Sequence, residues 1–430
     1  MNVIFAVLIF IAFVNTALHQ WTWVPASPES LSPMQVLTDG MIQSAKGSVE
    51  LALGLIGVMA FFLGLMKVAE RGGLLNMIGR LVRPLMIRLF PDIPPEHPAM
   101  GAMILNISAN ALGLGNAATP FGIRAMQELD SLNPHKGTAT DAMVLFLAIN
   151  TSSITLLPTG VIALRAAAGS NDPAGILATT LFATLCSTMV AILAAKGYQR
   201  LSTFPVEADP CDPQDKTPHM PSADTPLEAG PGYPASLSYL ALACFIVLIP
   251  LAIVYGRVIG PWVIPSLSLL LLGFGVVRRV AVYEVFVEGA KEGFQVAIKI
   301  IPFLVAILVA VGMFRQSGAM DGLVDLIDPL TSHVGLPAEA LTMALMRPLS
   351  GSGAFGLLAE AINNPAIGPD SYTGYLVSTL QGSTETTFYV LAVYFGAIQI
   401  RRTRHALAAG LTADAAGIVG AVIACTYLYG

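Results

Sequence analysis

The sequence predicts an all-α polytopic membrane protein built from two inverted-topology repeats. Three observations carry this prediction: a very apolar composition, a pair of similar segments with opposite charge, and four apolar segments that polar residues interrupt. Each repeat is expected to contain an amphipathic interfacial helix, a re-entrant helical hairpin and a broken transmembrane helix, the plan of many secondary transporters.

The composition indicates that most of the surface faces lipid. Of 430 residues, 55% are hydrophobic and 11% are charged, and the mean hydropathy is +0.71. Soluble domains carry about 25% charged residues. No basic cluster suggests a nucleic-acid partner, and the net charge of −5 lies largely in connecting segments. The four cysteines lack the spacing of metal ligands and the six histidines are scattered, so no metal centre is expected.

Long apolar runs predict membrane-spanning helices, because about 20 apolar residues cross the hydrocarbon core of a bilayer. The runs lie near residues 3–18, 48–68, 175–195, 237–256, 261–277, 296–314 and 405–428. The first run lacks the basic residues that open a signal peptide. A retained first helix is therefore favoured, with a cleaved signal peptide as the alternative.

A polar segment divides the chain into two membrane halves, residues 1–200 and 237–430. The intervening residues 201–236 are rich in proline and aspartate and have no apolar period, so a flexible cytoplasmic linker is expected. Repeat 1 is expected at about 40–197 and repeat 2 at about 285–430.

Two similar segments of opposite charge predict the inverted orientation of the repeats. AERGGLLNMIGRLVRPL (69–85) and FRQSGAMDGLVDLIDPL (314–330) share an apolar skeleton at a constant offset of 245, yet Arg83 matches Asp328. Because cytoplasmic loops collect Lys and Arg, the first segment is expected inside and the second outside. This assignment places the N-terminus inside and the C-terminus outside. The alternative is that the aspartates of the second segment line a solvated helix face.

Four apolar segments, residues 98–126, 140–165, 338–362 and 372–399, are interrupted by Gly, Asn, Ser, Thr or Pro. Helices broken inside lipid persist only where protein or a water-filled cavity surrounds the free backbone groups. Each half is therefore expected to combine one re-entrant hairpin with one crossing helix.

The interruptions in the first half favour a solute site. NISANALGLGNAATP (106–120) holds three asparagines, whose amides both donate and accept hydrogen bonds. The alternative is close helix packing through small residues. NTSSITLLPTG (150–160) places hydroxyl and amide groups before Pro158 and would supply oxygens to Na⁺. A proline-kinked helix with satisfied carbonyls is the alternative there.

Two charges stand out in the second half. Glu385 lies in QGSTETTFYV with no charge for 14 residues upstream and 15 downstream, and a carboxylate near the membrane centre is costly unless paired, protonated or hydrated. Its candidate roles are a proton-coupling acid, a ligand for a substrate amine, or a partner of Arg347. Arg347 suits a substrate carboxylate, since its guanidinium binds two oxygens at once. A structural ion pair between the two is the alternative.

The sequence gives no support for catalysis. SGSGAFG (350–356) superficially suggests a phosphate-binding loop, but no Lys-Ser/Thr follows it and no strand precedes it. The nearest histidines, His333 and His405, lie at expected membrane edges. The protein is therefore not expected to be an enzyme.

The motifs resemble a known family. NISANALGLGNAATPFGIRAM and FLAINTSSITLLPTGVIALR resemble spore maturation protein A, whereas MRPLSGSGAFG and GPDSYTGYLVSTLQGSTETTFYVLAVYFG resemble spore maturation protein B, so the chain looks like a fusion of the two. Both halves are similar to the nucleoside recognition (Gate) domain, which concentrative nucleoside transporters and the ferrous iron transporter B share more distantly. The resemblance implies a solute held at the hairpin tips near the midplane and moved by an elevator-like shift.

The expected site residues follow from the family resemblance together with the polar residues at the helix interruptions. The substrate-binding set is Asn106, Ser108, Asn110, Asn116, Asn150, Thr151, Ser152, Arg347, Ser350, Ser352, Gln381, Ser383, Thr384 and Glu385. The set for ion binding or coupling is Asn150, Ser153 and Glu385, with no cofactor beyond Na⁺ or H⁺ as the coupling ion.

The function expected from these observations is secondary-active transport of a small polar solute across a bacterial inner membrane by a homo-oligomer. An amino acid, short peptide or similar zwitterion is favoured, because Arg347 and Glu385 lie beside many amides. The alternatives are a nucleoside transporter and a non-transporting scaffold or receptor in envelope or spore maturation. An intramembrane enzyme is the weakest alternative, because it would need a histidine or metal site.

Overall fold

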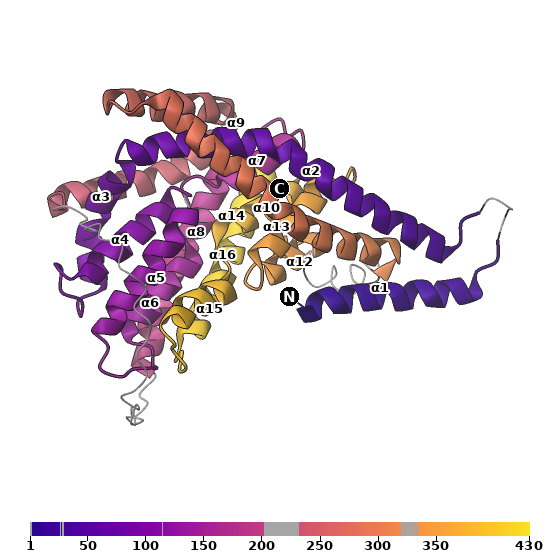
Figure 1. Ribbon diagram of the computed structural model, residues 1–430, viewed down its shortest axis with the longest axis horizontal. Helices are drawn as coiled ribbons and strands as arrows, with labels where there is room; N and C mark the ends of the chain where they lie inside the picture. Colours follow the sequence, from indigo (N-terminus) through magenta and orange to yellow (C-terminus); the bar gives the residue numbers. More distant parts are fainter. Residues whose placement is uncertain are drawn as a thin grey trace.

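The computed structural model describes residues 2–25, 27, 30–113, 115–201, 232–319, 322, 331 and 334–430. These residues form helices and connecting loops (Figure 1), with one isolated β-bridge between Thr138 and Arg402. The all-α class is therefore confirmed. Most of the predicted linker and the acidic segment with Asp321, Asp325 and Asp328 lie outside the described residues.

The first half begins with two long helices and continues through shorter ones. Ser32 caps the second helix by accepting a hydrogen bond from the Gln35 N–H, and Thr140 caps the sixth in the same way. The helices are α1 (Asn2–Thr22), α2 (Pro33–Arg71), α3 (Leu74–Leu89), α4 (Pro98–Ala111), α5 (Gly115–Ser131), α6 (Asp141–Ser152), α7 (Thr159–Ala167) and α8 (Ile176–Leu201).

The second half follows the same order from its second helix onward. Its helices are α9 (Ala235–Val277), α10 (Val282–Gln316), α12 (Ala338–Met346), α13 (Gly351–Asn363), α14 (Tyr372–Ser383), α15 (Thr387–Ala397) and α16 (Ala406–Tyr429). The runs 237–256 and 261–277, expected as separate helices, form the single helix α9. Among the described helices, α1, α2, α8 and α16 are long and apolar enough to cross a membrane.

Helices α2 and α10, which occupy matching places in the two halves, pack antiparallel. At one end Lys67 Nζ lies 2.8 Å from Glu292 Oε1. At the other end Gly40 lies against Gln316, so closely that a Cβ on Gly40 would overlap the Gln316 side chain. The N-terminal part of α2 and helix α1 extend together to one side of the bundle (Figure 1).

Helices α8 and α16 also occupy matching places and pack antiparallel. Ser187 Oγ donates to the Ala413 carbonyl at 2.8 Å, and the Tyr429 hydroxyl donates to the Gly175 carbonyl at 2.8 Å. Helix α16 presents small residues to this contact, and a Cβ on Gly420 would lie only 3.1 Å from Ala183 Cα. Close approach of this kind is the usual way in which membrane helices associate.

The loops of the two halves meet in two clusters. Loop 132–140 pairs with loop 398–405, where the Arg401 N–H donates to the Gly137 carbonyl at 2.9 Å. Loop 168–175 pairs with loop 364–371, where the Asn171 N–H donates to Asp370 Oδ2 at 2.7 Å. We call these the basic loop cluster (132–140 and 398–405) and the acidic loop cluster (168–175 and 364–371) after the residues they contain.

Candidate functional site

The interrupted helices of the two halves meet at their breaks. The first break separates α6 from α7, and the second separates α14 from α15. The Glu385 N–H in the second break donates to the Thr151 carbonyl at the end of α6, at 2.8 Å. Backbone groups that a continuous helix would pair internally therefore pair between the halves.

Each hairpin tip lies against the break of its own half. The Leu156 N–H donates to the Ala111 carbonyl at the end of α4, at 2.8 Å. The Phe388 N–H donates to the Pro348 carbonyl, between α12 and α13, at 3.1 Å. Gly113 has a φ of +72°, and a Cβ there would meet the Leu157 carbonyl, so this turn requires glycine. Two hairpin tips and two breaks thus surround one region.

Three predicted asparagines gather on the side of the first hairpin. Asn110 Nδ2 donates to Asn150 Oδ1 at 2.9 Å, because Asn110 faces the end of α6. Asn106, one helical turn before, donates to the Ala118 carbonyl at 2.8 Å and to the Tyr394 hydroxyl at 3.1 Å. The Tyr394 hydroxyl in turn donates to Asn150 Oδ1 at 3.3 Å. We call this group, Asn106, Asn110, Asn150 and Tyr394, the asparagine cluster.

The asparagine cluster holds one polar atom without a protein partner. Asn106 is fully buried, and its Oδ1 has no hydrogen bond among the described residues. A buried carbonyl oxygen without a partner is costly unless a water or ligand donates to it.

Arg347 holds the second break. Its Nε donates to the Gln381 carbonyl at 3.2 Å, its Nη1 donates to Thr386 Oγ1 at 2.9 Å, and its Nη2 donates to the Thr384 carbonyl. The bonds to Gln381 and Thr384 satisfy carbonyls that a continuous helix would have used. Arg347 Nη2 also lies 3.6 Å from Glu385 Oε2, and the Glu385 side chain is 46% exposed. In this conformation Arg347 therefore supports the backbone and pairs weakly with Glu385.

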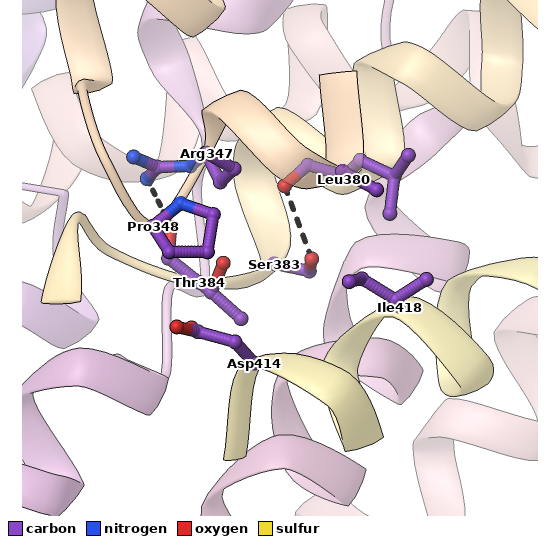
Figure 2. A pocket seen from close by; sticks show the side chains of 8 residues that line it. Arg347, Pro348, Leu380, Ser383, Thr384, Asp414 and Ile418 are labelled. Atoms are coloured by element: carbon purple, nitrogen blue, oxygen red, sulfur yellow. Dashed lines mark hydrogen bonds between the residues drawn. The ribbon is translucent and has the colours of Figure 1, made fainter. Parts of the chain in front are cut away.

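Asp414 of α16 reaches the same region from the opposite side of a small cavity (Figure 2). It is 3% exposed, and its Oδ2 accepts a hydrogen bond from the Thr387 hydroxyl at 2.6 Å. Its Oδ1 has no partner among the described residues. The cavity is lined by Ala344, Arg347, Pro348, Leu380, Ser383, Thr384, Asp414 and Ile418.

The cavity is too small for a solute in this conformation. Its volume is about 10 Å³, close to the roughly 10–15 Å³ that one water molecule needs. The site is thus closed around its own side chains.

Other predicted residues satisfy their hydroxyls locally. Ser108 donates to the Ile104 carbonyl and lies beside Gly79 of α3, away from the asparagine cluster. Thr151, Ser152 and Ser383 donate to carbonyls one turn earlier in their own helices. These hydroxyls stabilise helix ends and are not free to bind a ligand in this conformation.

The remaining predicted residues lie at the edges of the breaks. Ser350 caps α13 by accepting from the Gly353 N–H at 3.0 Å, and its hydroxyl lies 3.4 Å from that of Ser352. Ser153 has a φ of +26°, and its carbonyl accepts from Thr184. The Gln381 side-chain oxygen is buried without a partner among the described residues. The side chain of Asn116 lies outside the described residues.

Sequence reasoning missed Tyr394 and Asp414. Asp414 carried a usable signal, since it is the one charged residue in the sequence 406–429, and an ionisable group inside a spanning helix is a functional candidate. Tyr394 carried none, because it is one aromatic residue in an apolar segment. Among the described residues, no group of three or more His, Cys, Asp or Glu side chains is placed to hold a metal ion.

Comparisons with known proteins give matches in both halves of the chain. A family model described as nucleoside recognition (Gate) matches residues 52–168 and 297–401. Spore maturation protein A of Bacillus subtilis is 48% identical over 160 residues, which are 37% of this chain and 82% of that protein. Spore maturation protein B of the same organism is 48% identical over 167 residues, 39% of this chain and 93% of that protein.

A further relative is named for its location. Inner membrane protein YjiG of Escherichia coli (strain K12) is 30% identical over 103 residues, 24% of this chain and 64% of that protein. No solved structure gives a significant match.

Proposed function

The chain belongs to the nucleoside recognition (Gate) family and is similar to both spore maturation proteins A and B. From this premise we propose that it is a secondary-active transporter of a small polar solute. It is a multi-pass membrane protein, and one of its relatives is named an inner membrane protein. We place it in the bacterial inner membrane, with the solute site between the hairpin tips and the two breaks.

The observation that carries the proposal is the meeting of two interrupted helices inside a set of apolar helices. The bond from the Glu385 N–H to the Thr151 carbonyl joins the breaks of the two halves. Broken helices at membrane depth occur where they line a cavity or bind an ion or solute. A purely structural membrane protein has no need of two such breaks in contact.

The packing of the halves supports an inverted repeat. Matching helices α2 and α10 run antiparallel, and so do α8 and α16, as a two-fold axis in the membrane plane requires. In this proposal α4–α5 and α12–α13 are re-entrant hairpins, and α6–α7 and α14–α15 are the crossing helices. Movement of the hairpins relative to α2 and α10 would carry the solute in an elevator-like shift.

The charges near the breaks support a zwitterionic solute, such as an amino acid or short peptide. Arg347 would bind a carboxylate, Glu385 would bind an amine, and the asparagine cluster would bind amide or carbonyl groups. The coupling ion would be Na⁺ or H⁺. A nucleoside is the alternative solute, for which the family description is the supporting observation.

A second candidate function is a non-transporting scaffold or receptor. The observation that favours it is the closed site. The cavity has a volume of about 10 Å³, and the N–H groups of Arg347 already donate hydrogen bonds to the protein. A transporter caught in an occluded, empty conformation would have the same features, so transport itself has to be measured.

The test is solute flux in proteoliposomes that contain the purified full chain. A panel of radiolabelled amino acids, dipeptides and nucleosides is offered with an imposed Na⁺ or H⁺ gradient. We expect gradient-dependent uptake of at least one zwitterion, and loss of that uptake in Glu385→Gln, because the substitution removes the charge that would bind the amine and keeps the shape.

Glu96→Gln is the matched control. The Glu96 side chain is 92% exposed in a loop, so its flux should equal that of the unmodified protein. Absence of flux for every solute under every gradient would reject transport in favour of the scaffold, and nucleoside uptake alone would reject the zwitterion.

A further inference from the structure

The cavity between Arg347 and Asp414 has more carboxylates around it than positive charges. Arg347 is the one cation that lines it, and it lies 3.6 Å from Glu385. Glu385 exposes about half of its side chain. Asp414 is 3% exposed, so protein encloses its carboxyl.

The surroundings of the Asp414 carboxyl supply one hydrogen bond, and the other groups near it are mostly neutral. Thr387 donates to Oδ2, and the remaining helices packed against this part of α16 present neutral groups. On α6 the nearest group is the Thr151 hydroxyl, which faces Gly410, and on α8 it is the Ser187 hydroxyl, which faces Gly417. The ionisable Tyr394 of α15 is hydrogen-bonded to Asn106 and Asn150 and not to Asp414.

The distant charged groups do not alter this picture. Arg404, which precedes α16, pairs with Asp141 of α6 at 2.7 Å, more than two helical turns from Asp414. Among the described residues Arg347 is therefore the charge that acts on the Asp414 carboxyl, and its guanidinium is committed to the second break.

We propose that Asp414 is a proton-carrying carboxyl of the transport cycle, protonated in this closed conformation and ionised when the cavity opens to water. The Thr387 hydroxyl donates to Oδ2, which acts as the carbonyl oxygen. The proton sits on Oδ1, which has no partner among the described residues, and the Asp414 side chain lines a cavity with room for about one water molecule to accept the proton. An ionised carboxylate there would be buried with a single donor, which is costly.

Protonation and opening are linked through Arg347. When α12–α13 moves away from the second break, the guanidinium loses its carbonyl partners and becomes available to an ionised Asp414. The carboxyl then releases one proton to the water that enters, and closure takes one proton back. This role in coupling rests on the proposed function, whereas the protonation of Asp414 can be measured without transport.

Infrared spectroscopy of the full chain in lipid nanodiscs tests the protonation. Only a protonated carboxyl shows the carboxylic C=O stretching band, and exposed Asp and Glu are ionised above about pH 6, since their ordinary pKa values lie near 4. We expect such a band to persist above about pH 6 in the unmodified protein and to disappear in Asp414→Asn, which keeps the size of the side chain.

Glu360→Gln is the matched control, because Glu360 is also poorly exposed but pairs directly with Arg315. This variant should keep the band. A band that survives in Asp414→Asn, or its absence above about pH 6 in the unmodified protein, would overturn the proposal.

Thr387→Val provides a second test of the protonation if Asp414→Asn fails to fold. Valine has the shape of threonine and lacks the donor to Oδ2, so the band should move to higher frequency as the C=O bond strengthens. An unchanged band frequency would overturn the assignment. If the band behaves as expected while the unmodified protein shows no flux, the protonation stands and the transport proposal fails.

Discussion

Arg165 is the side chain that most firmly joins the two halves. It belongs to α7 and is fully buried, yet several of its partners come from α14 and the loop before it, in the other half. Its Nη1 donates to the Pro369 carbonyl at 2.6 Å, its Nη2 lies 3.1 Å from Asp370 Oδ1, and its guanidinium lies 4.2 Å from the centre of the Tyr375 ring. A planar cation with several donors is needed to make these contacts together.

We predict that Arg165→Lys lowers the free energy of unfolding by about 3 kcal/mol, because lysine keeps the charge but leaves buried acceptors unpaired. Equilibrium unfolding in mixed micelles measures the change. Arg71→Lys is the control: the Arg71–Glu288 pair is 57% and 47% exposed, so a loss within about 1 kcal/mol is expected. Equal losses in the two variants would contradict the joining role of Arg165.

At the scale of helices, the antiparallel contact between α2 and α10 depends on glycine. A Cβ on Gly289 would lie 2.5 Å from the Leu63 carbonyl and from Lys67 Cβ, and a Cβ on Gly293 would lie 2.7 Å from Ala60 Cα. Backbone atoms cannot move aside as a flexible side chain does. The two helices therefore approach as closely as they do because these positions lack side chains.

We predict that Gly293→Ala lowers the apparent melting temperature of the detergent-solubilised protein and that Gly57→Ala does not. Both glycines lie within these long helices, but nothing lies within 4 Å of a Cβ on Gly57. There alanine should be neutral or stabilising by up to about 1 kcal/mol, because it favours the helix. Thermal denaturation followed by size-exclusion chromatography measures both, and a tolerated Gly293→Ala would argue against tight packing.

The sequence predicts the positions of the helix breaks because a helix that is broken inside lipid needs polar side chains or a cavity around its free backbone groups, and such residues stand out in an apolar segment. Helix α4 ends and α5 begins inside the predicted interruption 106–120, and α6 ends inside 150–160. The same reasoning divided α9 wrongly, since the four residues between its two apolar runs do not end the helix. In lipid a helix keeps its backbone paired wherever it can.

The candidate site was only partly predictable for a different reason. Asn106 and Asn110 are four residues apart and share a helix face, which sequence spacing reveals. Tyr394 bonds to Asn106 from 288 residues along the chain, and no local pattern encodes such a contact. Arg347 was predicted as a ligand, but its donors satisfy the carbonyls of a break whose geometry only the fold defines.

For the whole molecule, the two loop clusters differ in charge. The basic loop cluster contains Lys136, Arg401, Arg402 and Arg404, whereas the acidic loop cluster contains Asp172 and Asp370 and no Lys or Arg. Basic residues mark the cytoplasmic side of a membrane protein. On this rule we expect the basic cluster on the cytoplasmic side. This expectation matches the predicted outside position of the C-terminus, since Tyr429 bonds to Gly175 of the acidic cluster.

The loops 132–140 and 364–371 occupy matching places in the two halves, so an inverted repeat requires them to lie on opposite membrane faces. We predict that a membrane-impermeant maleimide, applied to intact spheroplasts, labels Ala366→Cys and not Lys136→Cys, both of which are accessible positions. The background is a chain whose native cysteines, Cys186, Cys211, Cys244 and Cys425, are replaced by alanine. Permeabilised cells should label both variants, which controls for reactivity. Labelling of both positions from outside, or of neither, would mean that the halves have the same orientation, and the antiparallel pairs α2–α10 and α8–α16 would then need another explanation.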